Sequence, residues 1–192
     1  MAPEVHRAAL ALCLRRWQDG DGQALQEVVA HCQGRVLHLA RKALRGFPGV
    51  HRWEQTDDIA QNVSIRLWKA LHECKPATPE QLLGLLSQHM RWELLSLKRR
   101  YYGPEGVGAN HGTNAGEMID TPDRQPSLER SWFAVHELVE KLPAKEREVV
   151  DLLLYQGLTQ PEAAALLDVA ERTVNNRYAT AKLLLKQAMP EN

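Results

Sequence analysis

The stretch TQPEAAALLDVAERTVNNRY, residues 159–178, carries the signals of two helices joined by a tight turn. Thr159 and Glu162 form a capping box that opens a short helix. Asp168 lies in the turn, and a longer helix follows from about Glu171. The small and apolar side chains that would pack between the two helices are Ala164, Leu167, Val169, Val174 and Tyr178. This pattern predicts a helix-turn-helix, whose second helix can lie in the major groove of DNA.

The opening turns of that second helix carry side chains that suit base recognition. Asn can form two hydrogen bonds with adenine, and Arg can form two with guanine. Lys182, one turn further on, suits a phosphate. The side chains that we expect to contact DNA are Arg172, Thr173, Asn175, Asn176, Arg177 and Lys182. The alternative is that this face is the solvated side of an ordinary helical hairpin.

Two more helices are predicted directly before this motif. Residues 144–156 predict a helix that Gly157 ends. Residues 128–141 predict another, with Ser127 as its cap and Leu142-Pro143 as its end.

The first half of the chain also shows helical spacing and no strand pattern. Apolar side chains recur every three or four residues over 23–45, as on a buried helix face. Thr56 can cap the next helix, which has an apolar stripe from Ile59 to Ala70. Thr78 and Gln81 form a capping box around Pro79 and open a long helix that reaches about residue 102.

A segment rich in Gly and Pro separates these two groups of helices. Residues 103–130 contain five Gly and three Pro and show neither a helical nor an alternating period. Such a segment reads as a flexible linker. We therefore expect an all-α chain of two helical domains, 1–102 and 128–192, joined by a linker over 103–127.

The net charge is zero, but the charges are unevenly distributed along the chain. Residues 1–102 hold 15 Lys and Arg against 10 Asp and Glu, whereas residues 131–192 hold 7 against 9. A weakly negative second domain fits a module that a partner holds on DNA, because its own affinity for phosphates would be low.

The end of the helix predicted over 79–102 mixes basic and aromatic side chains. Its last twelve residues read RWELLSLKRRYY. Cations can follow the phosphates of a single strand while rings stack on its unpaired bases. The candidate contacts are Arg91, Trp92, Lys98, Arg99 and Arg100. The alternative is a basic helix end favoured by the helix dipole, with Trp92 in the core.

The stretch DDIAQNVSIRLW, residues 57–68, has polar side chains on one face and a large aromatic near its end. Adjacent helical residues diverge by about 100°, so Asp57 and Asp58 do not form a catalytic carboxylate pair. They are expected either to complement the helix dipole or to belong to a surface for a protein partner.

Other classes of site find little support in the sequence. Three cysteines without a CxxC pair argue against a disulfide framework and a cysteine zinc site, and the eight histidines are scattered. There is no phosphate-binding loop and no nucleophile motif, so we expect no enzyme activity, cofactor or metal. The longest apolar run has seven residues, too short to span a membrane. With no secretory signal, the expected compartment is the cytoplasm.

In their order along the chain, these motifs resemble the extracytoplasmic-function class of bacterial RNA polymerase sigma factors of the sigma-70 family. The resemblance covers nearly the whole chain, and the phrase YYGPEGVGANH is typical of planctomycete forms. Four positions depart from the family pattern. An acid is usual at Asn62 and an Asp at Ser96, a Gly is usual at Asp168, and a basic residue is common at Thr180. Asp can adopt the left-handed conformation that a turn of this kind needs.

The resemblance implies a role for each motif. The residues expected to bind core RNA polymerase are Asp57, Asp58, Gln61, Asn62 and Trp68. The helix that ends in Lys98-Arg99-Arg100 would melt the promoter, and the helix-turn-helix would read the upstream promoter element. The implied partners are core RNA polymerase and promoter DNA, both double- and single-stranded, while an anti-sigma factor is left open.

Two rival interpretations remain at this point. A stand-alone helix-turn-helix regulator would dimerise and bind a palindrome without polymerase. An enzyme such as a phosphotransfer protein would use Asp57 or a histidine. Co-purification with core polymerase would separate the sigma factor from both.

Overall fold

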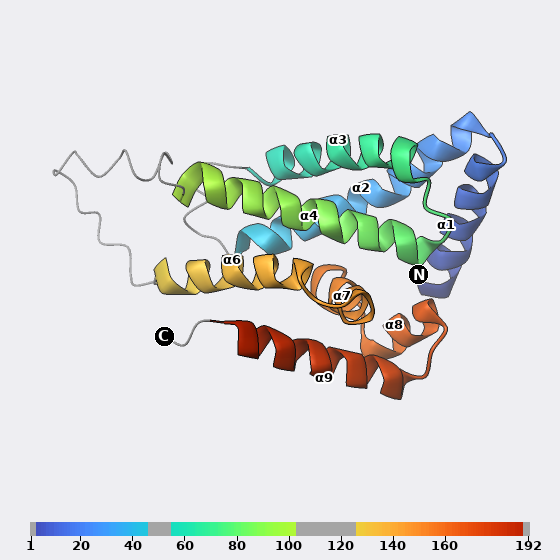
Figure 1. The fold of residues 1–192 in the computed structure, drawn as a ribbon. Coiled ribbons are helices and arrows are strands. Elements are labelled where there is room, and N and C mark those ends of the chain that lie inside the picture. The colour runs from blue at the N-terminus through green and yellow to red at the C-terminus, as the bar shows by residue number, and fades with distance from the viewer. Residues whose placement is uncertain (1–2, 46–54, 103–125, 190–192) are drawn as a thin grey trace.

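The structure, a computed structural model, describes residues 3–45, 55–102 and 126–189, and every regular element in these ranges is a helix (Figure 1). The first half holds α1 (Pro3–Gln18), α2 (Gly22–Arg45), α3 (Thr56–Cys74) and α4 (Pro79–Tyr102). The second half holds α6 (Pro126–Glu140), α7 (Ala144–Val150), the π-helical segment η2 (Asp151–Tyr155), α8 (Gln160–Leu167) and α9 (Glu171–Ala188). The predicted all-α fold class is confirmed.

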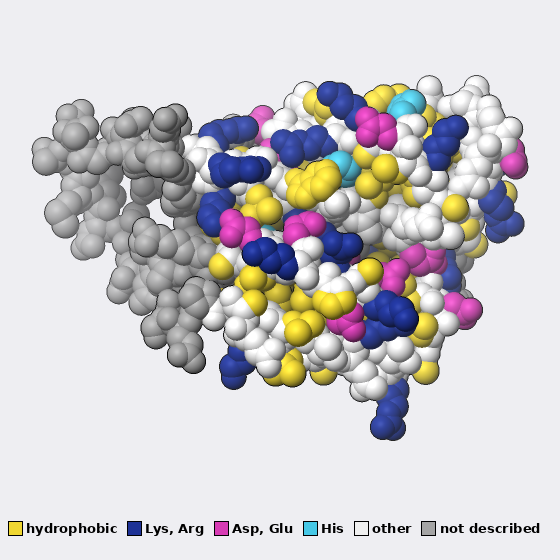
Figure 2. Space-filling view, in the orientation of Figure 1, with side chains coloured by type: hydrophobic (Ala, Val, Ile, Leu, Met, Phe, Trp, Pro, Cys, Tyr) yellow, Lys and Arg dark blue, Asp and Glu magenta, His cyan; other side chains and the backbone are white. Residues whose placement is uncertain are grey.

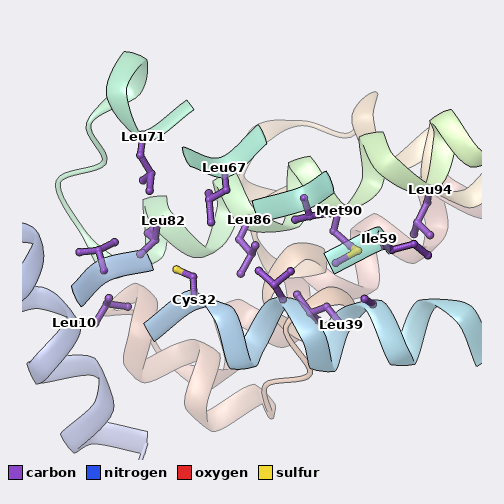
Figure 3. Close-up of a cluster of buried hydrophobic side chains, with 14 of the residues drawn as sticks. Leu10, Cys32, Leu39, Ile59, Leu67, Leu71, Leu82, Leu86, Met90 and Leu94 are labelled. Carbon is purple, nitrogen blue, oxygen red and sulfur yellow. The ribbon is translucent and has the colours of Figure 1, made fainter. Parts of the chain in front are cut away.

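The largest hydrophobic core lies between α2 on one side and α3 and α4 on the other (Figure 3). The apolar stripe predicted for α3 is buried, with Ile59, Val63 and Leu67 almost inaccessible to solvent. Leu82, Leu86 and other apolar side chains of α4 meet this stripe. Each fully buried side chain of this size contributes roughly 1.5–3 kcal/mol, so this core fixes the relative positions of the three helices.

Two helices start earlier than predicted, α3 by one residue and α6 by two. The N-cap of α3 is Gln55, not Thr56, and its backbone N donates to Asp58 Oδ2 at 3.2 Å. The prediction was wrong here because the Asp58 carboxylate reaches back one turn to the first free amide. The helix α6 begins at Pro126, so Ser127 lies inside its first turn instead of capping it.

The helix-turn-helix forms as predicted. Thr159 and Glu162 form the capping box, with Thr159 N donating to Glu162 Oε2 at 2.8 Å. Asp168 ends α8 in the left-handed conformation with a φ of 52°. Val174 of α9 is fully buried against Ala163 and Ala164 of α8. The first turns of α9 are therefore held at a fixed angle to α8.

Residues 144–156 do not form the single α-helix that was predicted. The chain keeps α-helical geometry to Val150 and then forms the π-helical turn η2, in which Gln156 N donates to Asp151 O at 2.9 Å. Gly157 ends the segment with a φ of 68°. The wider turn packs against α4, and Asp151, Tyr155 and Gln156 are all buried there.

The two halves of the chain pack together. The helix α4 lies between α3 and α6, and η2 and α8 also contact it (Figure 1). Phe133 of α6 belongs to the core of the first half, and Leu83 of α4 belongs to the core under the helix-turn-helix. Nearly all of the predicted linker lies outside the described residues, so the division into two domains stays a prediction. None of the described helices has both the length and the apolar character needed to cross a membrane.

Candidate functional site

The predicted DNA-reading face of α9 is accessible. Arg172 and Asn176 are exposed, and Thr173, Asn175 and Arg177 are partly exposed, while Val174 between them faces the core. Lys182 is exposed one turn further on, with Nζ 4.8 Å from the centroid of the Tyr178 ring. Amide and guanidinium groups therefore project from the first turns of a helix that α8 holds firmly. That arrangement allows bidentate hydrogen bonding to base edges.

The predicted partner surface on α3 is also largely exposed. Asp57, Asp58 and Gln61 face solvent at its start, and Trp68 is 42% exposed further along. Ile65, which the sequence analysis did not single out, is 48% exposed. Ile65 and Trp68 are three residues apart on the helix, so the two exposed apolar side chains lie on the same side of α3.

The end of α4 presents the basic cluster. Arg99 and Arg100 are exposed, and Figure 2 shows Lys and Arg side chains gathered over this end of the molecule. Trp92 is 41% exposed and meets the His89 ring edge-on, so it does not lie in the core. Lys98 instead donates from Nζ to Glu137 Oε1 of α6 at 2.7 Å. Within the described residues, no three His, Cys, Asp or Glu side chains gather closely enough to hold a metal ion.

Comparison with known proteins assigns the family. Residues 132–185 match the family model described as sigma-70, region 4. The chain is 27% identical to the RNA polymerase sigma factor CnrH of Cupriavidus metallidurans over 86% of each chain. It is 25% identical to the ECF RNA polymerase sigma factor ShbA of Streptomyces griseus, over 88% of this chain and 85% of ShbA. The chain belongs to the sigma-70 family. It is an RNA polymerase sigma factor of the extracytoplasmic-function class, and it functions in transcription initiation.

The chain also matches a solved structure of CnrH. It shows CnrH in complex with the cytosolic domain of CnrY, with a TM-score of 0.40 and 24% identity, over 93% of this chain and 96% of that one. A TM-score at this level is too low to carry an inference about arrangement. The likeness of the sigma factor to planctomycete forms stays a prediction.

Asn62, expected on the polymerase-binding surface, makes a contact inside the sigma factor. Its Nδ2 donates at 2.9 Å to Oε1 of Glu93, a residue of α4 with no exposed surface. Arg66 Nη2 forms an ion pair with the other oxygen, Oε2, at 3.0 Å. The sequence analysis missed Glu93, although a carboxylate within an apolar helix stretch is a signal for a buried partner. Asn62 therefore joins α3 to α4.

Arg91, expected to contact DNA, is 1% exposed in the arrangement that the structure shows. Its Nε donates to Glu140 Oε1 at 2.7 Å and its Nη1 donates to Asp151. The guanidinium carbon also lies 5.0 Å from the centroid of the Tyr155 ring. Arg91 thus connects α4 to α6 and η2.

The surroundings of Arg91 shift the pKa values of its neighbours. Burial raises the pKa of Asp151 to about 6, and the positive charge of Arg91 acts against that shift. Burial lowers the pKa of His136 to about 4, and Arg91 lowers it further. His136 Nδ1 is 2.6 Å from the Tyr155 hydroxyl. At neutral pH the cluster therefore holds a neutral imidazole beside a buried ion pair.

Arg91 belongs to a face of α4 that is mostly polar, so apolar periodicity in the sequence does not predict that it is buried. Leu83, Ser87 and Arg91 follow one another at intervals of four residues and share one face of α4. Gln156 Nε2 donates to Ser87 Oγ at 2.8 Å and to Leu83 O at 3.3 Å. This face of α4 meets the second half of the chain.

Proposed function

We propose that this sigma factor binds core RNA polymerase through α3, opens promoter DNA with the end of α4, and reads the upstream promoter element with α9. The observation that carries the proposal is the exposed amide and guanidinium face of α9, which lies inside the part matched to sigma-70 region 4. Transcription from a promoter library by this chain with core polymerase tests it directly. We propose that the chain has no catalytic role of its own. We also propose that it acts in the cytoplasm, where the polymerase acts.

The polymerase surface would consist of Asp57, Gln61, Ile65 and Trp68, which are all exposed on α3. Asp58 was also expected there, but its carboxylate caps the helix, so charge reversal at Asp58 would disturb the fold as well. The double variant Asp57→Arg/Gln61→Ala leaves that cap in place and is expected to weaken capture of core polymerase. Glu73→Arg, an exposed acid at the other end of α3, is the control. Equal capture of core polymerase by the wild type, the double variant and Glu73→Arg would contradict this surface.

Promoter opening would rest on Lys98, Arg99, Arg100 and Trp92. Three cations can hold phosphates while the exposed indole stacks on an unpaired base. The triple variant Lys98/Arg99/Arg100→Ala is expected to bind core polymerase normally and to yield few open complexes. Permanganate footprinting measures open complexes as reactive thymines. Full thymine reactivity in the triple variant would remove these residues from the mechanism.

Upstream recognition would separate base contacts from phosphate contacts. Losing a base contact costs about 1–3 kcal/mol and relaxes the preference at one position, whereas losing a phosphate contact weakens every sequence alike. We therefore expect Asn176→Ala or Arg177→Ala to change the upstream sequence that is selected from the library. Lys182→Ala is expected to lower the amount of transcript without changing the upstream sequence that is selected. Unchanged selection by an Asn175/Asn176/Arg177→Ala triple variant would show that α9 is not the reader.

A protein regulator is a further proposed partner. The relative CnrH has been solved in complex with the cytosolic domain of CnrY. A protein that binds this sigma factor, such as an anti-sigma factor, is expected to appear when the chain is captured from its own cells. Capture of core polymerase in the same experiment would exclude a regulator that acts without polymerase.

A further inference from the structure

His89 is a buried polar side chain of α4 whose hydrogen-bonding groups are unused. Its residue is 6% exposed, and neither ring nitrogen has a hydrogen-bond partner among the described residues. Burying a polar group without a partner costs stability, whereas an apolar ring of similar shape would not. Glu93 lies one turn further on the same face of α4, but Asn62 and Arg66 already bind that carboxylate. The imidazole therefore has a donor and an acceptor that the fold leaves for something else.

The imidazole is uncharged at neutral pH. Burial lowers the pKa of His89, and the positive charge of Arg66 lowers it further. In a neutral imidazole one nitrogen donates a hydrogen bond and the other accepts one. The edge of a nucleobase also offers donors and acceptors side by side, so the two groups are complementary. A phosphate, which accepts only, suits this group less well.

Two side chains beside His89 supply the other chemistry that a single-stranded nucleic acid needs. The exposed Trp92 indole meets the imidazole edge-on, with ring centroids 5.1 Å apart, and an aromatic face can stack on a base. Arg66 comes from α3 and is partly exposed. Its guanidinium has five N–H groups, so the ion pair with Glu93 leaves others for a phosphate.

This side of α4 is accessible in the arrangement that the structure shows. The α4 residues that meet the second half of the chain include Leu83, Ser87 and Arg91, which follow one another at intervals of four. Trp92 and Arg99 are two turns apart on a different side of the helix, and both are exposed. A strand held at the basic end of α4 can therefore continue past Trp92 towards α3.

We propose that His89 contacts the edge of one unpaired base of the opened promoter. The exposed indole of Trp92 turns outward and stacks on that base, which brings the edge of the base to the imidazole. Arg66 is placed to hold an adjacent phosphate. The inference rests on the proposed function, because it adds a base-specific contact to the strand-holding surface proposed for the end of α4.

Two matched histidine variants, each assembled with core polymerase, test this site. His89→Phe keeps an aromatic ring beside Trp92 and removes both nitrogens, so it is expected to be at least as stable as the wild type in urea. His72→Phe is the control, because His72 also lies beside an exposed indole, that of Trp68, with ring centroids 4.8 Å apart. Each holoenzyme is purified before the measurement, so that a change in polymerase binding does not enter the comparison.

The probe is a labelled single-stranded oligonucleotide that covers the opened segment of a promoter selected from the library. Fluorescence anisotropy measures its affinity for each holoenzyme, with every position replaced in turn by the other three bases. We expect the wild type and His72→Phe to prefer one base at one position by about three- to tenfold. His89→Phe should lose that preference, because stacking alone tolerates every base. His89→Gln, whose amide keeps a donor and an acceptor, should retain most of it.

The other outcomes separate the inference from the proposed function. The wild-type base preference in His89→Phe, or its equal loss in His72→Phe, would overturn the contact and leave the proposed function in place. A clear loss of stability in His89→Phe would show that the imidazole has a partner inside the chain, which also overturns the inference. A wild-type holoenzyme that does not bind the oligonucleotide would overturn the proposed role of α4, and the inference with it.

Discussion

The substitution Asn62→Asp tests the buried contact between α3 and α4. It restores the acid that is usual at this position in the family, so the resemblance alone predicts no harm. The structure predicts the opposite. Asn62 Nδ2 donates to Glu93 Oε1 at 2.9 Å, and Glu93 has no exposed surface. In the variant, a second carboxylate replaces that donor.

The size of the effect follows from the contacts. A hydrogen bond to a charged group contributes about 1.5–3 kcal/mol, and the variant keeps one only if one of the two carboxyl groups is protonated. Two carboxylates this close do not both ionise, so the pair keeps one proton. Holding that proton at pH 7, about three units above an ordinary carboxyl pKa, costs about 4 kcal/mol. Because Arg66 lies 3.0 Å from the Glu93 carboxylate, it offsets part of the cost. We expect Asn62→Asp to lower the free energy of unfolding by about 2–4 kcal/mol.

Urea unfolding followed by circular dichroism at pH 7 and at pH 5 measures this loss. The proton is held only in the folded state, so the deficit is expected to shrink as the pH falls, by about 1.4 kcal/mol per unit. Gln61→Glu makes the same amide-to-acid change at the adjacent, exposed position and is the control. Adding Glu93→Gln to Asn62→Asp restores a donor and an acceptor and is expected to recover most of the stability. Wild-type stability of Asn62→Asp at pH 7 would refute the reasoning.

Three further predictions concern stability. Thr159→Ala removes the cap of α8 and should lower the free energy of unfolding by about 1 kcal/mol, whereas Thr180→Ala, at an exposed site on α9, should not. Asp58→Arg should lower the free energy of unfolding by roughly 1 kcal/mol more than Asp57→Arg in the same urea assay, because only Asp58 accepts a hydrogen bond from the Gln55 amide. The lowered pKa of His136 means that its neutral form adds stability above pH 6.5, and this stability is lost as the pH falls towards 4. On acidification from pH 7 to 4.5, the free energy of unfolding of His136→Gln should therefore fall by about 2 kcal/mol less than that of the wild type. Because the pKa of Asp151 is raised, the variant should then become more stable as the pH falls through that range.

The sequence predicted the features that depend on neighbours along the chain. The Thr159 capping box, the left-handed Asp168 and the buried stripe of α3 each follow from residues within one or two helical turns. The helix α1 was not predicted, although Leu10, Cys13, Leu14 and Trp17 have helical spacing and the first three are buried.

What the sequence did not predict depends on contacts between distant residues. The face of α4 that carries Leu83, Ser87 and Arg91 is mostly polar, so a search for apolar periodicity passes over it. The burial of Arg91 depends on Glu140 and Asp151, which are 49 and 60 residues away. Asn62 is half-buried because of Glu93, 31 residues further on. No local pattern contains that information.

The π-helical turn η2 makes the register of one helix adjustable by a single residue. A π turn holds one more residue than an α turn, so deletion of one residue within 151–155 would leave an ordinary α-helix. The residues that follow the deletion would keep their order in the chain. The helix α7 would rotate by about 100° relative to Gln156 and the helices after it. Gln156 would then turn away from Ser87 and Leu83, while the capping box at Thr159 and the packing of α8 on α9 would stay intact. The same rotation would move Val149 and Leu152 relative to Ala163 and Val174, with which they share a core, so the π turn also sets how α7 packs on α8 and α9.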